Sequence, residues 1–201
     1  LGGSAWLTFG RIRAAHLNAV AYGWSSMIGM AVVVWMTARL SRVEVPYGGL
    51  LRIACVLWNF GVFSGLLGLL IGGDLSLTLL NITLVLPTQS TSIEWLEFPQ
   101  YVPPILTLAL CMVSAVVLLM FAKRRERHVY VTQWYMLGAV VWMPLVYLTA
   151  VGLCVYGPLH GLVGLTSKGV VQASVNWWFA HNVLGLWITP IGVGSAYYLI
   201  P

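Results

Sequence analysis

Five long apolar segments constrain the fold of this chain more than any other feature of its sequence. They cover roughly residues 14–40, 50–72, 104–122, 134–156 and 171–200. A bilayer core of about 30 Å is crossed by about 20 helical residues that each rise about 1.5 Å, so each segment is long enough to cross it once. We identify no segment with the alternation that a membrane β-barrel requires. The sequence therefore predicts an all-α, polytopic transmembrane bundle of about five helices.

Composition excludes a water-soluble domain. Of the 201 residues, 60% are hydrophobic and 7% are charged, whereas soluble domains carry about 25% charged residues. The net charge of +5 does not predict a nucleic-acid partner, because the basic residues form short clusters between apolar segments. The expected surroundings are membrane lipid. Cys55, Cys111 and Cys154 each lie in an apolar segment without a CxxC or CxxCH motif, and we interpret them as buried hydrophobic residues.

The basic residues also predict the orientation. Those between the first and second segments and between the third and fourth are Arg39, Arg42, Arg52, Lys123, Arg124, Arg125 and Arg127. The opposite side has only Arg11, Arg13 and Lys168. The positive-inside rule places the richer side in the cytoplasm. Arg11 and Arg13 are exceptions to this rule, and we expect them to have a partner.

Glycines line one side of the second segment. Gly61, Gly65, Gly68 and Gly72 are spaced four, three and four residues apart. This spacing gives a smooth helix face, which favours the close approach of another helix.

Two of the four histidines lie within apolar segments. His128 follows a basic cluster and His160 lies in a turn-rich loop, so both are interpreted as loop residues. His16 and His181 are different, because an imidazole in hydrocarbon is costly unless it binds a neighbour, a metal or water. A hydrogen bond to another helix is one interpretation, and a metal site is the other. His16 lies one turn after Arg13, and that pair suits a haem iron and its carboxylates.

His181 is predicted to lie about 15 Å into the last segment, near the middle of the membrane. It follows the aromatic pair Trp177 and Trp178. A neutral imidazole at that depth suits copper or iron.

Three stretches resemble one family in the same order and at similar spacing. Phe9-Gly-Arg-Ile-Arg-Ala-Ala-His16-Leu-Asn-Ala-Val20 is similar to a helix opening in the catalytic subunit of cbb-type haem–copper oxidases. Asn176-Trp-Trp-Phe-Ala-His181-Asn182 resembles the later copper-ligand helix, and Lys123-Arg-Arg-Glu-Arg-His-Val-Tyr-Val131 resembles the loop between them. The resemblance implies that residues 1–201 are a single transmembrane domain. They would be a fragment covering the second to sixth helices of a roughly twelve-helix subunit.

The resemblance also implies roles for individual residues. His16 would be an axial ligand of a low-spin haem b, with Arg13 and the nearby Arg11 at the haem propionates. His181 would be one of three histidines on a copper ion that faces a high-spin haem. Glu97 resembles an acidic outer-loop position that holds calcium, and a solvated loop acid is the alternative. Ala14 and Ala15 depart mildly from the family pattern before His16.

The function implied is that of a respiratory terminal oxidase. Such a subunit reduces dioxygen to water with electrons from cytochrome c-type subunits and couples this to proton translocation. Two alternatives remain open from the sequence. A nitric oxide reductase of the same superfamily would hold iron in place of copper. A membrane bundle without cofactors, such as a transporter or an assembly partner, would retain the fold alone.

Overall fold

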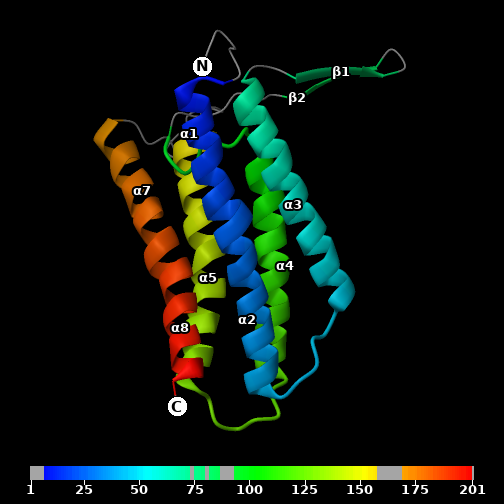
Figure 1. Ribbon diagram of the computed structural model, residues 1–201, viewed down its shortest axis with the longest axis vertical. Helices are drawn as coiled ribbons and strands as arrows, with labels where there is room; N and C mark the ends of the chain where they lie inside the picture. The colour runs from blue at the N-terminus through cyan, green and yellow to red at the C-terminus, as the bar shows by residue number, and fades with distance from the viewer. Residues whose placement is uncertain (1–6, 73–74, 80–81, 87–92, 158–168, 201) are drawn as a thin grey trace.

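A bundle of long helices forms the body of the protein (Figure 1). The computed structural model describes residues 7–72, 75–79, 82–86, 93–157 and 169–200. The first helix is continuous from α1 (Phe9–Asn18) through a π-helical segment (Ala19–Ser25) to α2 (Ser26–Ser41). The next three are α3 (Gly48–Ile71), α4 (Val102–Ala122) and α5 (Val131–Val151), the last extended by a π-helical segment at Gly152–Tyr156. The final helix joins α7 (Gly169–Asn182), a π-helical segment (Val183–Ile188) and α8 (Thr189–Leu199).

The predicted helical bundle is confirmed, and the helix bounds agree to within a few residues except at the first start. That helix begins at Phe9 rather than near residue 14. Hydropathy identifies only the part of a helix that matches the bilayer, so a more polar first turn is missed. As a result, Arg11 and Arg13 are helical residues.

Four of the described helices are long and apolar enough to cross a membrane: Phe9–Ser41, Gly48–Ile71, Val102–Ala122 and Val131–Tyr156. The helix over residues 169–199 packs along α5 and is of similar length, but it is not among these four. Gln172, Asn176 and Asn182 make its first half more polar. A helix of this kind is suited to contact with protein on several sides rather than with lipid.

A short hairpin in the loop between α3 and α4 was not predicted. Strand β1 (Leu75–Leu79) pairs antiparallel with β2 (Ile82–Leu86). The alternation of leucines with Ser76 and Thr78 is the strand pattern that hydropathy averaging hides. The hairpin extends sideways from one end of the bundle (Figure 1).

The glycine face of α3 allows close packing, as predicted. A Cβ atom on Gly61 would lie 2.9 Å from Leu106 Cδ2 of α4. A Cβ atom on Gly65 would lie 2.6 Å from Phe98 Cδ1 of the loop before α4. The glycine face therefore packs against α4 at Gly61 and against the loop before α4 at Gly65.

The loops α2–α3 and α4–α5 lie at the same end of the bundle, with the C-terminal end of α8 (Figure 1). The backbone N–H of Arg125 donates to the Ser41 carbonyl at 2.9 Å, and Gln133 Nε2 donates to Ser41 Oγ at 3.1 Å. These bonds hold the end of α2 to the α4–α5 loop and to the first turn of α5. Two cysteines differ from expectation, since Cys55 and Cys111 are exposed on the outside of the bundle while Cys154 is buried.

Candidate cofactor-binding site

His16 lies on the exposed side of α1. Within the described part of the chain its ring makes no recorded hydrogen bond or ion pair, so the interpretation as an interhelical hydrogen bond has no support there. Val20 and Trp24, one and two turns further on, are also exposed. The helix changes to π geometry at Ala19, directly after this turn. Such segments are rare and are frequent at functional sites.

His181 has the same features in the last helix. It is exposed near the middle of residues 169–199, beside exposed Trp177 and Trp178. The π-helical segment begins at Val183, two residues later. A Cβ atom on Gly185 would lie 3.7 Å from Nε2 of His181, so the absence of a side chain there leaves the ring nitrogen open.

His16 and His181 lie on different helices, α1 and α7. No group of three or more histidine, cysteine or acidic side chains that could hold a metal exists among the described residues. A complete metal site therefore needs ligands besides those placed here. His128 is exposed and packs edge-on against Tyr130, in agreement with its loop assignment. His160 and Lys168 lie outside the described residues.

Arg11 has partners within the chain. Its Nη1 donates to the carbonyl oxygens of Ile71 at 2.9 Å and Leu70 at 3.2 Å. These are the last carbonyls of α3, which no helical N–H can reach, and a cation is favourable at that end of a helix. Arg11 thus caps α3 and fixes the start of α1 against it.

Arg13 also has a partner, because its guanidinium forms an ion pair with Glu94. Both side chains are about half exposed, at 49% and 45%. An exposed pair of this kind contributes little to stability. The guanidinium therefore remains accessible to a second anion near His16.

Glu97 is buried, with 6% of its surface exposed, so the alternative of a solvated loop acid is wrong. Asn18 Nδ2 of α1 donates to its carboxyl at 2.7 Å. Burial raises the pKa of Glu97, and the bonds from Asn18 and the backbone oppose this only in part. The Oδ1 of Asn18 is also buried, and it has no recorded hydrogen bond within the described structure. A carboxyl and an amide oxygen thus lie together near the end of the bundle where α1 begins.

Sequence reasoning missed the residues that hold this loop. Tyr22 donates from its hydroxyl to the Trp95 carbonyl at 2.6 Å, and Asn176 Nδ2 donates to the Glu94 carbonyl at 2.7 Å. Trp95 has a positive φ of 71°, a conformation that a bulky residue adopts only when its surroundings hold it. Asparagines within apolar segments are the signal that could have indicated the contact of Asn176, since buried amides need partners.

Comparison with known proteins identifies the family. The family model described as Cytochrome C and Quinol oxidase polypeptide I matches residues 2–201. The chain belongs to this family. As a member of the oxidase polypeptide I family with four helices able to span a bilayer, it is a multi-pass protein of the bacterial inner membrane.

Several relatives within the family are cytochrome c oxidase subunits. Cytochrome c oxidase subunit 1 homolog of Azorhizobium caulinodans is 28% identical over 98% of this chain and 33% of its own length. Cytochrome c oxidase subunit 1 of Rhodobacter capsulatus is 26% identical over 99% of this chain and 35% of its own length. The cbb3-type cytochrome c oxidase subunit CcoN1 of Stutzerimonas stutzeri is 25% identical over 98% of this chain and 38% of its own length. The chain spans about a third of the length of these relatives, and the resemblance to cbb-type subunits is confirmed.

Proposed function

We propose that this chain is part of the catalytic subunit of a respiratory oxidase that reduces dioxygen to water. The electrons would come from cytochrome c-type partner subunits, and the reaction would be coupled to proton translocation. The match of the oxidase family over residues 2–201 carries this proposal. The names of the relatives, cytochrome c oxidase subunit 1, favour dioxygen over nitric oxide as the substrate. Because the chain spans about a third of those relatives, this activity belongs to the complete subunit.

We propose that His16 would hold the iron of a low-spin haem b. The residues present suit a haem, because an exposed imidazole lies on a helix face with exposed Val20 and Trp24. When bound, a haem supplies an iron that accepts and passes on single electrons. His16 would hold the iron through one ring nitrogen, and the apolar side chains would cover the ring system and exclude water.

We assign different roles to the two arginines. Arg13 is half exposed, and its partner Glu94 is equally accessible, so it can share its guanidinium with a haem carboxylate. Arg11 is occupied by the carbonyls at the end of α3. Arg11 would therefore act on the haem indirectly, because it fixes the first turn of the helix that carries Arg13 and His16.

We propose His181 as one of the copper ligands. Imidazole nitrogen is a good donor for copper, and Gly185 leaves Nε2 of this histidine open. The family resemblance implies two further histidines and a high-spin haem opposite the copper. Since His181 belongs to no group of three or more histidine, cysteine or acidic side chains among the described residues, those ligands would come from the remainder of the subunit.

We also propose a calcium ion at Glu97. The Glu97 carboxyl and the unpaired Asn18 Oδ1 are oxygen donors that lie close together, and calcium takes six to eight oxygens. The described residues supply too few, so haem carboxylates or water would complete the shell.

The haem and metal content of the purified complete subunit tests the proposed function. We expect b-type haem in the absorption spectrum and copper by metal analysis. A colourless, metal-free protein would favour the bundle without cofactors. Non-haem iron in place of copper, with reduction of nitric oxide, would favour the nitric oxide reductase.

A further inference from the structure

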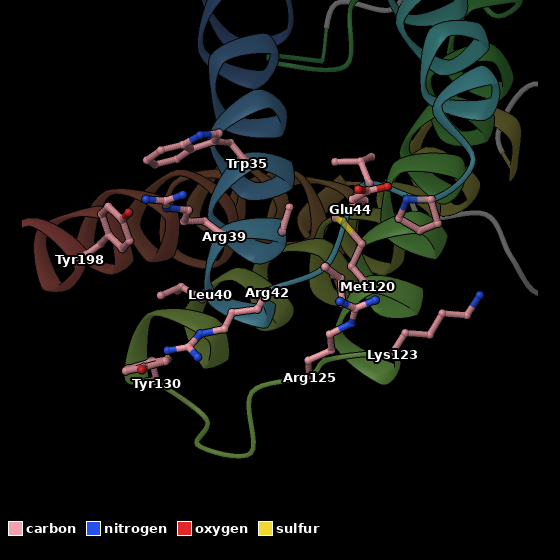
Figure 2. Close-up of a pocket in the computed structure, with 14 residues that line it drawn as sticks. Trp35, Arg39, Leu40, Arg42, Glu44, Met120, Lys123, Arg125, Tyr130 and Tyr198 are labelled. Atoms are coloured by element: carbon pink, nitrogen blue, oxygen red, sulfur yellow. The ribbon is translucent and has the colours of Figure 1, made fainter.

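A cavity lies at the end of the bundle opposite His16, where α2, α4 and α8 finish. It has a volume of about 1130 Å³ and is bounded by α2, the loops α2–α3 and α4–α5, and α8 (Figure 2). Pockets for small ligands usually hold about 300–1,000 Å³. The cavity is therefore large enough for a sizeable group.

Positive charge dominates its wall. Arg39, Arg42, Lys123 and Arg125 line the cavity, and Glu44 is the only acid among the lining residues. Arg42 is paired with Glu126 at 3.3 Å, and Lys123 lies over the ring of Tyr47 at 5.6 Å. Arg39 and Arg125 are exposed and have no recorded ion pair within the described chain. Both guanidinium groups are thus available to anions, at different parts of the cavity wall (Figure 2).

The rest of the cavity wall consists largely of aromatic and apolar side chains, as is typical of a membrane interface. Trp35, Tyr130 and Tyr198 line the cavity (Figure 2), and the rings of Trp35 and Tyr198 meet edge to face at 5.5 Å. Tryptophan and tyrosine gather where the hydrocarbon meets the headgroups. Leu40 and Met120 add apolar surface beside the charged groups. One cavity therefore offers both anion-binding groups and apolar surface.

We propose that this cavity binds the phosphate headgroup of an anionic phospholipid from the adjacent leaflet. The phosphodiester would lie against Arg39, beside the rings of Trp35 and Tyr198 (Figure 2), with Arg125 adding positive charge from another part of the wall, and the first acyl carbons would pack on the apolar wall. Basic pockets between helices on the cytoplasmic side suit such headgroups. Free phosphate shares the charge, but it would leave the apolar wall uncovered. This site does not depend on the haem or on the proposed oxidase activity.

The test uses the complete, purified and delipidated protein and native mass spectrometry with added phosphatidylglycerol or phosphatidylcholine. The variant Arg39→Gln with Arg125→Gln removes the two unpaired charges. The control Arg124→Gln with Arg127→Gln removes the same charge from exposed positions outside the cavity. Because each basic residue contributes about 1 kcal/mol near an anionic surface, we expect binding of phosphatidylglycerol to weaken by roughly tenfold or more in the first variant only. Both double variants should keep the thermal stability of the unmodified protein, which serves as the folding control.

Three results would overturn the proposal. Equal loss in the two double variants would show a general effect of surface charge. Equal binding of phosphatidylcholine by the unmodified protein would show that the phosphoanion is not recognised. Displacement of the lipid by excess inorganic phosphate would assign the cavity to a soluble anion instead.

Discussion

At the residue scale, both candidate ligands stand immediately before a change of helix geometry. His16 precedes the π-helical segment Ala19–Ser25, and His181 precedes Val183–Ile188. A π-helical turn holds an extra residue, so it shifts the side chains that follow relative to those before it. The histidine and the residues one turn later therefore face directions that a regular helix would not allow.

Replacement of His16 by alanine tests the haem ligand. In the complete subunit, His16→Ala should abolish the low-spin haem b absorption, because ligation by two histidines needs both imidazoles. The helix should still insert, since its apolar residues are unchanged. The control His128→Ala removes an exposed loop histidine and should leave the spectrum intact. A normal low-spin band in His16→Ala would rule out this ligand.

Glu97 predicts a pH dependence of stability. Burial raises the pKa of this carboxyl in the folded protein above its ordinary value of 4.5, so the folded state holds the proton more tightly than the unfolded state. Its contribution to stability is full below about pH 4.5 and is lost as the pH rises through the raised pKa. Glu97→Gln mimics the protonated acid and should reduce the fall in apparent Tm with rising pH. Thermal melts in the presence of a calcium chelator measure this, and an unchanged pH profile would contradict it.

Single residues show where sequence reasoning stops. The cost of an imidazole in hydrocarbon identified His16 and His181 without any structure. The partners of Arg11 and Glu97 were not predictable, because each lies about 60 to 80 positions away along the chain. Apolar periodicity does not say which loop returns to which helix end, and these contacts depend on that arrangement.

At the scale of elements, the glycine face of α3 determines how closely the loop before α4 can pack. Gly65→Ala would place a methyl group 2.6 Å from a ring carbon of Phe98. We expect this overpacking to lower stability by about 1–3 kcal/mol. The matched control is Gly138→Ala in α5, where a Cβ atom meets nothing within 4 Å, and alanine also favours the helix. Denaturation of both variants in the same detergent provides the comparison, and equal stability would contradict the packing argument.

The elements themselves were predicted unequally. Length and hydropathy located the interiors of all the helices that the structure describes. The first turns at Phe9 and Val131 and the strands β1 and β2 were not predicted, because polar or alternating residues lower the hydropathy averaged over a window. The π-helical segments could not be predicted either, because nothing in the apolar pattern distinguishes them from the α-helix around them.

At the scale of the whole molecule, the orientation follows from the charge on the two ends of the bundle. A cysteine in place of Ser90, between α3 and α4, should react with an impermeant thiol reagent on intact cells. A cysteine in place of Arg127, between α4 and α5, should react only after lysis. A background without Cys55 and Cys111 is required, because both are exposed. The reverse pattern would invert the topology and move the proposed haem to the cytoplasmic end.

The central claim is that this chain supplies ligands to two separate centres of an oxidase. His16 and His181 lie on different helices, and neither belongs to a group of three or more possible metal ligands within the described structure. Loss of the metal at one centre should therefore leave the other centre intact. The most direct measurement is copper analysis beside a haem spectrum on the same sample of the complete subunit carrying His181→Ala. We expect copper to be depleted and dioxygen reduction to stop, while the low-spin haem b remains. Full copper with near-normal turnover in this variant would contradict the account.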